Sequence, residues 1–560
     1  MATATLSNAE IADRLAALAQ LLSLQKENPY KIRAYQRAAA KIRTLSESIE
    51  DLVRKDSDLT VFAGIGDAIS HAVQEIVRTG TLTKLETLRS KVPPEVAGMT
   101  SYPRLDPKRV LRAYKKLGIG SVEELRTQLE SGKLEQVLGM RLAQHVRQGM
   151  TESHAMLLYR AHELRQSVEE FLLNICKAKA VEAVGDYRRR VETIEELSFI
   201  VDTDDWLSLV ARIERYGGHT PKVKATKTNA TFSLSAGVLL HIEKATKDNW
   251  GLALIKCTGS KAHLRKLTAV TGRWNVVTDA GPFASEADFF RMFNLSWIEP
   301  ELREGYDEVE LALRGTLPVL VTENDIRGEL HAHSTSSDGS HTIEQMAIAA
   351  RDFGYEYVGI TDHSQSLKIA RGVSVEDLWT QIRFIDKLNS RLSDIRVLKS
   401  AEVDILADGS LDYPDELLKE LDYTVCSIHS RFAFGKEQQT ARILRAMDNR
   451  YFNILGHATG RLLLKRPGYE LDMERIIRHA RESGCFFEIN SSPDRLDLSA
   501  ENARLANRAG LKIAISTDAH STDEFGTVRY GIDQARRAGL EAASVLNCMS
   551  WSSLEPLFRR

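Results

Sequence analysis

Histidines and carboxylates follow a series of apolar runs in the second half of the chain. His331 and His333 stand one residue apart at the end of one run, so in an extended strand both side chains point to the same face. A lone histidine at such a position is usually structural. Here the pattern recurs, and it brings together nine imidazole and carboxylate side chains: His331, His333, Asp338, His363, Glu402, His429, His457, Asp518 and His520. We therefore expect a metal centre.

Seven apolar runs are spaced along this half of the chain, and six of them carry the nine side chains. The runs are 326–331, 355–361, 396–403, 422–428, 452–456, 485–490 and 511–516. Amphipathic helical stretches lie between most of them, and this alternation predicts a parallel sheet with helical crossovers, closed or nearly closed. In a parallel barrel the carboxyl ends of the strands meet at one face. The nine side chains should therefore line one cup.

The ligand types narrow the chemistry of this cup. Imidazole and carboxylate groups without thiolates suit Mn²⁺, Zn²⁺ or Fe²⁺, and the sequence does not choose among them. Nine ligands are enough for two or three ions. Such sites activate a water and hold the attacking and leaving oxygens of a phosphoryl transfer, so we expect phosphoester hydrolysis by a water held at these ligands. Arg461 either adds a contact to the phosphate or is a solvated surface arginine.

Length and composition set outer limits on the protein. With 560 residues, and about 100–200 residues per domain, several domains are expected. The net charge of -2 means that any contact with nucleic acid must be made by local patches. No apolar run reaches the ~18 residues of a membrane span, and the amino terminus has no signal-peptide pattern. Five cysteines without a C-x-x-C spacing indicate a reducing cytoplasm.

The first 150 residues are expected to be helical. Apolar spacing predicts a helix over 9–25 and a second one from Tyr30, rich in basic residues. Gly64-Ile65-Gly66 then reads as the tight turn of a helix-hairpin-helix, whose backbone N–H groups can hold a phosphate. The alternative is an ordinary packing corner between two helices. Two further hairpin-like stretches, at 102–117 and 137–143, lack part of the expected glycines.

From about residue 151 the pattern becomes mixed. A long helix is expected over 155–179, followed by a strand at 197–201 and further strands near 222–244. This pattern predicts an α+β module, and residues 317–325 read as a linker to the C-terminal half.

The region 326–560 resembles the PHP (polymerase and histidinol phosphatase) domain. The motifs that carry the resemblance are His331-Ala-His333, Ser337-Asp338-Gly339, Thr361-Asp362-His363, Glu402, Ser427-Ile-His429-Ser430, Gly456-His457 and Asp518-Ala-His520. The resemblance implies a distorted seven-stranded (βα)7 barrel. It also implies three ions, held by His331, His333, Glu402 and Asp518, by Glu402, His429 and His457, and by Asp338, His363 and His520.

The region 1–320 resembles the polymerase part of bacterial family X DNA polymerases, through motifs at 28–35, 62–66, 185–189, 258–263 and 300–305. The resemblance implies an all-α DNA-binding domain with a helix-hairpin-helix (1–88), a fingers-like domain (89–150), an α+β nucleotidyltransferase-like palm (151–250) and a thumb-like domain (251–321) ahead of the PHP domain (326–560). It also implies that Lys31, Arg33, Gly64 and Gly66 contact DNA.

The palm departs from the family pattern. The family has a serine before the arginines and three metal-binding aspartates, and the residues at these positions are Asp186, Glu196, Ser198 and His241. Polymerisation needs carboxylates that hold two Mg²⁺ ions, whereas a serine offers a neutral oxygen and a histidine is a poor ligand for Mg²⁺. Asp202 and Asp204 could substitute only with a shift in register. We therefore predict a palm without polymerase activity, whose vestigial contacts to nucleotide or DNA are Arg188, Arg189, Gly259 and Ser260.

Together these observations predict a metal-dependent phosphoesterase that acts on DNA ends. The resemblance implies a 3′–5′ exonuclease or 3′-end-processing enzyme of DNA repair, with gapped, nicked or 3′-recessed duplex as its partner, in the bacterial cytoplasm at the nucleoid. Two alternatives stay open. One is an active gap-filling polymerase with a proofreading PHP domain, and the other is a small-molecule phosphatase of the histidinol-phosphate type.

Overall fold

The computed structural model describes residues 6–25, 27–62, 64–91, 116–118, 122–140, 143, 146, 155–234, 238–272 and 282–559. The chain divides into two compact units. The first comprises residues 1–188, 193–260 and 267–293, and the second comprises residues 189–192, 261–266 and 294–560. The finer division into five domains stays a prediction. None of the helices in the described ranges is both long and apolar enough to span a membrane.

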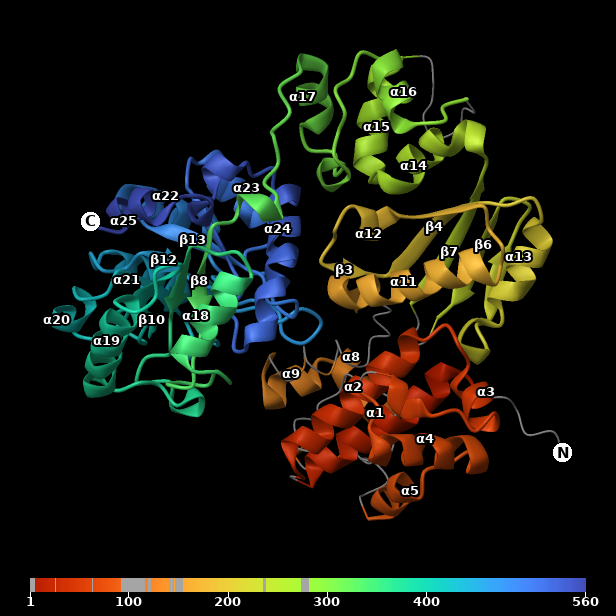
Figure 1. Ribbon diagram of the computed structural model, residues 1–560, viewed down its shortest axis with the longest axis horizontal. Coiled ribbons are helices and arrows are strands. Elements are labelled where there is room, and N and C mark those ends of the chain that lie inside the picture. Colours follow the sequence, from red (N-terminus) through yellow and green to blue (C-terminus); the bar gives the residue numbers. More distant parts are fainter. Residues whose placement is uncertain are drawn as a thin grey trace. The chain divides into compact units, whose positions relative to one another are not determined.

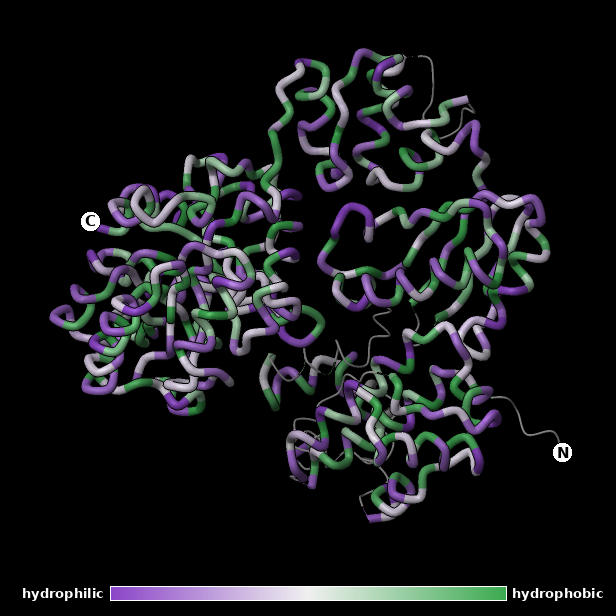
Figure 2. Tube along the Cα trace, in the orientation of Figure 1, coloured by the Kyte–Doolittle hydropathy of each residue, from purple (hydrophilic) through white to green (hydrophobic). Residues whose placement is uncertain are grey.

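The amino-terminal part of the first unit is helical, as predicted. Its helices are α1 (Asn8–Leu24), α2 (Pro29–Thr44), α3 (Ile49–Arg54), α4 (Asp67–Thr79), α5 (Thr83–Ser90), α8 (Val122–Glu130) and α9 (Lys133–Leu138). Hydrophobic and hydrophilic residues alternate along these helices (Figure 2). Their apolar faces share one core, in which Ile11, Leu15 and Leu18 of α1 are fully buried.

The predicted hairpin glycines lie immediately before α4. A 3₁₀ turn at Leu59–Val61 leads to Gly64, whose φ of 89° is a left-handed conformation that favours glycine. Gly66 then caps α4, and no side chain provides a capping hydrogen bond there. Of the stretch 102–117, residues 102–115 lie outside the described residues. Of the stretch 137–143, residues 137–140 and 143 are described, and α9 ends at Leu138 with Gly139 as its C-cap.

The rest of the first unit contains a five-stranded mixed sheet in the order β2-β4-β7-β6-β5. Its strands are β2 (Ala180–Val184), β4 (Glu196–Asp202), β5 (Lys222–Ala225), β6 (Asn229–Ser233) and β7 (Leu239–Ala245), and a separate pair is formed by β1 (Met156–Leu157) and β3 (Thr193–Ile194). The helices of this region are α11 (Leu158–Asn174), α12 (Gly185–Arg188), α13 (Trp206–Ile213), α14 (Trp250–Thr258) and α16 (Glu286–Met292). Helix α15 (Lys261–Val270) is divided between the two units, since residues 261–266 belong to the second. The predicted α+β module is therefore present.

The second unit is built on a seven-stranded parallel sheet, in which every strand pairs with its neighbours in sequence. The strands are β8 (Gly328–Ala332), β9 (Tyr357–Ile360), β10 (Arg396–Asp404), β11 (Tyr423–Ser427), β12 (Ile454–Leu455), β13 (Phe486–Asn490) and β14 (Ile513–Ser516). Ala332 and Ala519 form a parallel bridge, which joins the first strand to the segment after the last one. The predicted near-closed seven-stranded barrel is confirmed.

Helices surround these strands (Figure 1). They are α18 (Ile343–Asp352), α19 (Val375–Asn389), α20 (Asp415–Leu418), α21 (Lys436–Met447), α22 (Met473–Ser483), α23 (Ala500–Arg508), α24 (Val528–Arg537) and α25 (Trp551–Phe558), and α17 (Glu308–Arg314) precedes the barrel. A large apolar core joins the helices to the strands. A second core combines residues of the strands with Trp551, Leu554 and Phe558 of α25.

Tyr423 links three of the barrel strands. Its hydroxyl on β11 donates a 2.6 Å hydrogen bond to the carbonyl of Leu330 on β8. The ring can lie there because β9 has glycine at position 359, where a Cβ would stand 1.8 Å from the Tyr423 hydroxyl oxygen. Gly359 is buried, and the atoms nearest to such a Cβ belong to the Tyr423 phenol and the Ser400 hydroxyl. The buried Tyr423 ring would have to move to make room for it.

We predict that Gly359→Ala lowers the free energy of unfolding of the barrel by about 1–3 kcal/mol, because the added methyl group overpacks the interior. Thermal and urea unfolding would measure the change. Gly526→Ala is the matched control, since a Cβ at position 526 meets no atom within 4 Å. Equal stability of the two variants would contradict the packing argument.

Candidate metal centre

Glu402, at the carboxyl end of β10, is the centre of the cup. Its carboxylate is buried, and five histidine rings from other elements approach it. The nitrogens are His457 Nε2 at 2.9 Å, His429 Nε2 at 3.3 Å and His331 Nε2 at 3.6 Å from Oε1, and His363 Nδ1 at 2.6 Å and His333 Nε2 at 3.8 Å from Oε2. The Glu402 carboxylate therefore connects the end of β10 to the ends of four other strands.

Asp518 forms a second focus with the first two histidines. Its Oδ1 lies 3.0 Å from His333 Nε2 and 3.6 Å from His331 Nε2. The backbone at Asp518 has φ 55° and that at His457 has φ 24°. Such conformations are strained for residues other than glycine, and they persist where the surrounding structure imposes them, often at functional sites. The strain is consistent with a demand for precise side-chain direction.

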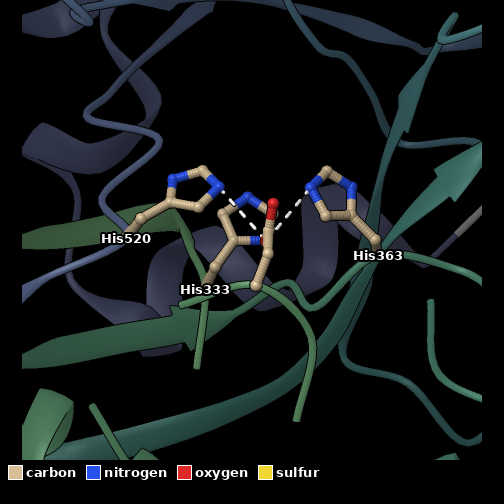
Figure 3. A group of neighbouring side chains, drawn as sticks. His333, His363 and His520 are labelled. Atoms are coloured by element: carbon tan, nitrogen blue, oxygen red, sulfur yellow. Dashed lines mark ion pairs between the residues drawn. The ribbon is translucent and has the colours of Figure 1, made fainter. Parts of the chain in front are cut away.

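Asp338 forms a third focus. Its Oδ1 lies 3.5 Å from His363 Nε2 and 3.3 Å from His520 Nε2. The ring of His333 lies between those of His363 and His520, at 4.4 and 4.2 Å between centroids (Figure 3). The structure thus brings all nine predicted side chains into one cup.

The arrangement fits cations. Three groups have ligand atoms that all lie within 4.8 Å of one another, namely His331, His333 and Asp518, then His363, Glu402 and His429, then His333, Asp338, His363 and His520. His331 Nε2 is buried without a hydrogen bond although two carboxylate oxygens lie 3.6 Å away. An imidazole nitrogen that faces carboxylate oxygens at this distance, without a hydrogen bond, has the geometry expected around a metal ion that binds both kinds of ligand.

The electrostatics of the cup are dominated by the proximity of the imidazoles and carboxylates. Burial opposes ionisation of Glu402, but His429, His363 and His331 together hold its pKa well below the usual range. Burial likewise opposes protonation of His363 and His429, yet the Glu402 charge raises the pKa of His363 to about 10 and that of His429 to about 9. In contrast, burial and the neighbouring His363 and His520 lower the pKa of His333 to about 4.

A second layer of acids orients the histidines, and the sequence analysis missed it. Glu488 on β13 binds His331 Nδ1 through Oε1 at 2.6 Å, and its Oε2 accepts the backbone N–H of His457 at 2.7 Å. Asp404 on β10 binds His429 Nδ1 at 2.9 Å. These contacts turn the opposite ring nitrogens toward the cup, as outer carboxylates do for metal-bound histidines.

Two more buried acids support the backbone around the cup. Asp362 accepts hydrogen bonds from Ser334, Ser337 and Gln381. Glu329 accepts the N–H of His331 at 2.9 Å and the hydroxyl of Thr517 at 2.8 Å, and burial raises its pKa to about 7. Glu329 and His331, like Glu402 and Asp404 and like Glu488 and Asn490, stand two residues apart on one strand. This spacing of two residues is the sequence signal that could have identified the outer acids Glu329, Asp404 and Glu488.

The arginine predicted to reach the phosphate has other partners. The guanidinium of Arg461 pairs with Glu192 at 2.6 Å and donates to the carbonyl of Arg495 at 3.0 Å. Arg495 itself lies beside the predicted ligand Asp518, with its Nε 3.6 Å from Asp518 Oδ2. With its side chain 16% exposed, Arg461 is not a solvated surface arginine, and its contact to a phosphate stays a prediction.

The palm positions present a different picture. Ser198 on β4 pairs in register with His241 on the parallel strand β7, so the strands place them side by side. Ser198 donates to Glu196 Oε1 at 2.9 Å, and His241 Nδ1 lies 3.1 Å from the hydroxyl of Thr231. Asp202 ends β4, whereas Asp204 lies beyond it and pairs with Lys179. Within the described ranges, groups of three or more metal-ligand side chains occur only in the barrel.

The comparisons with known proteins agree with this layout. Residues 6–82 match the model of a helix-hairpin-helix domain, and residues 329–492 match that of the PHP domain. The DNA polymerase/3′-5′ exonuclease PolX of Bacillus subtilis (strain 168) is 31% identical, over 98% of this chain and 98% of that protein. The chain belongs to the PolX family. A probable phosphatase of Thermoanaerobacter sp. (strain X514) is 30% identical over 39% of the chain and 89% of its own length.

In this PolX-family chain the predicted vestigial arginines are bound to protein groups. Arg188 forms a bidentate pair with Glu286, at 2.9 and 2.7 Å, and donates to the hydroxyl of Thr258 at 3.0 Å. Arg189 pairs with Glu304 at 3.2 Å. Asp186 lies in the short helix α12, and Gly259 and Ser260 form the break between α14 and α15. The charges of both arginines are therefore compensated internally.

The predicted DNA contacts of the amino-terminal region lie at its surface. Lys31 pairs with Glu27 at 3.4 Å, and the guanidinium of Arg33 stands 6.0 Å from the centre of the Tyr30 ring, which is 76% exposed. A Cβ at Gly64 or Gly66 would meet no atom within 4 Å. The turn before α4 is thus open on its outer side.

We predict that Glu488→Gln weakens metal binding by about 10–100-fold, the usual effect of removing an outer partner of a metal-bound histidine. The amide offers one acceptor oxygen, whereas His331 Nδ1 and the N–H of His457 each need one. Titration with Mn²⁺ followed by calorimetry, and metal content after dialysis, would measure the loss. Glu482→Gln on the exposed face of α22 is the matched control. Unchanged affinity in Glu488→Gln would contradict an orienting role.

Proposed function

We propose that this protein is a metal-dependent phosphoesterase that removes nucleotides or phosphates from the 3′ ends of DNA. The observation that carries the proposal is the cup of nine imidazole and carboxylate side chains around Glu402. It lies in a chain that aligns from end to end with a DNA polymerase/3′-5′ exonuclease. The expected role is 3′–5′ exonuclease or 3′-end processing during DNA repair.

The nine side chains divide into three ligand sets. We assign one ion to His331, His333, Glu402 and Asp518, a second to Glu402, His429 and His457, and a third to Asp338, His363 and His520. His363 presents Nδ1 to Glu402 and Nε2 to Asp338, so its ring connects two of the sets. Mn²⁺, Zn²⁺ and Fe²⁺ all suit these donors, in two or three sites.

The protein's own groups prepare the site for a phosphate. Divalent ions, when bound, would supply Lewis-acid activation of water and neutralise charge on the phosphoryl oxygens. Glu488 and Asp404 fix the rings of His331 and His429, and Asp338 and His520, with side chains 34% exposed, leave one side of the cup open to a substrate. Arg495, with its side chain 23% exposed beside Asp518, is a second group that we propose to contact the substrate phosphate, in addition to the predicted Arg461.

The amino-terminal helices supply DNA binding in this proposal. The uncapped turn at Gly64 and Gly66 exposes the amino end of α4, which can accept a phosphate without reading a base. Lys31 and Arg33 add positive charge to the same region of the chain. Gapped, nicked or 3′-recessed duplex is the expected partner, and the bacterial cytoplasm at the nucleoid is the expected location.

A small-molecule phosphatase is the second candidate, because the barrel alone is similar to several probable phosphatases. In that case a compound such as histidinol phosphate would be hydrolysed, and DNA would not. The end-to-end similarity to PolX and the helix-hairpin-helix in the same chain favour DNA.

We predict that the purified protein with Mn²⁺ shortens or dephosphorylates a labelled 3′-recessed duplex, and that a chelator abolishes this activity. His331→Ala should lower the activity by at least ~100-fold, because losing a metal ligand has a larger effect than losing an outer partner of a ligand. Gel analysis of the labelled strand would measure the products. His479→Ala, on the outer helix α22, is the control. If the DNA stays intact while histidinol phosphate is hydrolysed, the nuclease proposal is wrong and the small-molecule phosphatase is favoured.

We also propose that the palm does not polymerise, because Ser198 and His241 replace two of the carboxylates that Mg²⁺ needs. In the His331→Ala background, which spares the primer, no extension of a gapped primer–template is expected with Mg²⁺ or Mn²⁺. Primer-extension assays would measure it. Extension that disappears on adding Glu196→Ala would instead establish the gap-filling polymerase alternative.

A further inference from the structure

A ten-residue loop, Ser364 to Val373, leaves the cup directly after His363 and returns to it. Ser364 and Val373 form a parallel bridge, and the N–H of Val373 donates to the carbonyl of His363 at 2.8 Å. Gly372 makes the close return feasible, since a Cβ there would stand 2.0 Å from the carbonyl oxygen of Ser364. Both ends of the loop are therefore attached to a residue of the cup.

Polar contacts hold the base of this loop. The backbone N–H of Ser366 donates to Asp412 at 2.8 Å, and its hydroxyl donates to Asp404 Oδ2 at 2.8 Å. The other oxygen of Asp404 holds His429. Since the loop shares an anchoring carboxylate with a cup histidine, its position is set by the same structure that sets the cup.

The tip of the loop carries an unusual side chain for such a fixed element. A 3₁₀ turn at Lys368–Ala370 buries Ala370 and turns Ile369 outward, where it is 93% exposed, the highest value among the large apolar side chains in the described ranges. Lys368 and Arg371 beside it are exposed, and neither takes part in an ion pair within the part of the chain that the structure describes. Single exposed apolar residues are common, but this one stands between two such cations on a loop whose ends are attached to the cup.

The burial of the cup explains what this tip could do. His331, His333, Glu402 and His457 are at most 2% exposed, so a phosphodiester inside a stacked duplex cannot reach them. A terminal nucleotide must first leave its partner strand, which costs a few kcal/mol of pairing and stacking. Apolar side chains that insert at base steps stabilise such unstacked geometry, and cations on either side bind the flanking phosphates.

We propose that the loop 364–373 is a strand-separating element, in which Ile369 packs against the terminal base pair of a 3′ end while Lys368 and Arg371 bind phosphates. The inference rests on the proposed 3′-end nuclease function and names how that function selects its substrate. The occupant of the exposed tip is the end of a DNA duplex, to which the tip is complementary in both charge and apolar surface.

The test compares Ile369→Ala with Val319→Ala, a control at another highly exposed apolar residue, 81% exposed, outside the cup. With Mn²⁺, rates are measured on a blunt duplex, on the same duplex with a mismatched 3′-terminal pair, and on the labelled single strand alone. The ratio of duplex to single-strand rates should fall by about tenfold in Ile369→Ala, in line with the loss of one stacking contact. The terminal mismatch should restore much of the ratio, and Val319→Ala should retain the wild-type ratio.

A second variant separates the two parts of the tip. Lys368→Ala with Arg371→Ala should weaken binding to duplex and single strand alike and make it less dependent on salt. An unchanged ratio in Ile369→Ala, with wild-type enzyme active on DNA, would overturn the strand-separating role alone. An equal loss of rate on all three substrates would also overturn the strand-separating role, because such a loss would indicate that Ile369 supports the structure of the cup. Wild-type enzyme inactive on every DNA would overturn the proposed function and this inference with it.

Discussion

The buried carboxylate of Glu402 is the constraint on which the barrel depends. An ionised carboxylate removed from water is costly unless opposite charges and hydrogen-bond donors compensate it. Here the compensation comes from histidines on four other strand ends. Each of these rings needs its own fixed direction, which Glu488 and Asp404 provide for two of them. The need to compensate the charge of Glu402 thus involves two layers of side chains, the second of which reaches β13 through Glu488.

The barrel topology explains how such distant residues can meet. Parallel strands that pair strictly in sequence order bring seven carboxyl ends to one face, so a residue near position 331 and one near 518 become neighbours. The bridge from Ala332 to Ala519 closes the ring at this face. At the same time the interior is filled by groups such as Tyr423, which needs Gly359 to fit. Closure and packing therefore fix the strand ends from which the side chains of the cup extend.

Much of this arrangement could be predicted because strand ends have a simple geometry. The pair His331 and His333 and the alternation of apolar runs with helices were sufficient to predict the barrel and its face. Glu488 was missed because it lies in the one strand that carries no predicted ligand, whereas Asp404 stands two residues after the predicted ligand Glu402. Arg461 could not be placed from sequence, since its partner Glu192 is 269 positions away in the chain. Long-range ion pairs of this kind have no local signal.

The contrast between cup and palm has a physical basis. In the cup, replacing one ligand would leave several buried imidazoles or carboxylates without partners, so the fold as well as the chemistry would suffer. The palm positions are linked by few contacts. Ser198 and Glu196 bind each other, and His241, with its side chain 23% exposed, contacts the hydroxyl of Thr231 and the carboxylate of Glu243. Carboxylates can be exchanged there for neutral groups while β4 and β7 remain paired in register. Fold stability therefore ties the barrel to its ligand set, whereas in the palm only polymerisation would require the aspartates.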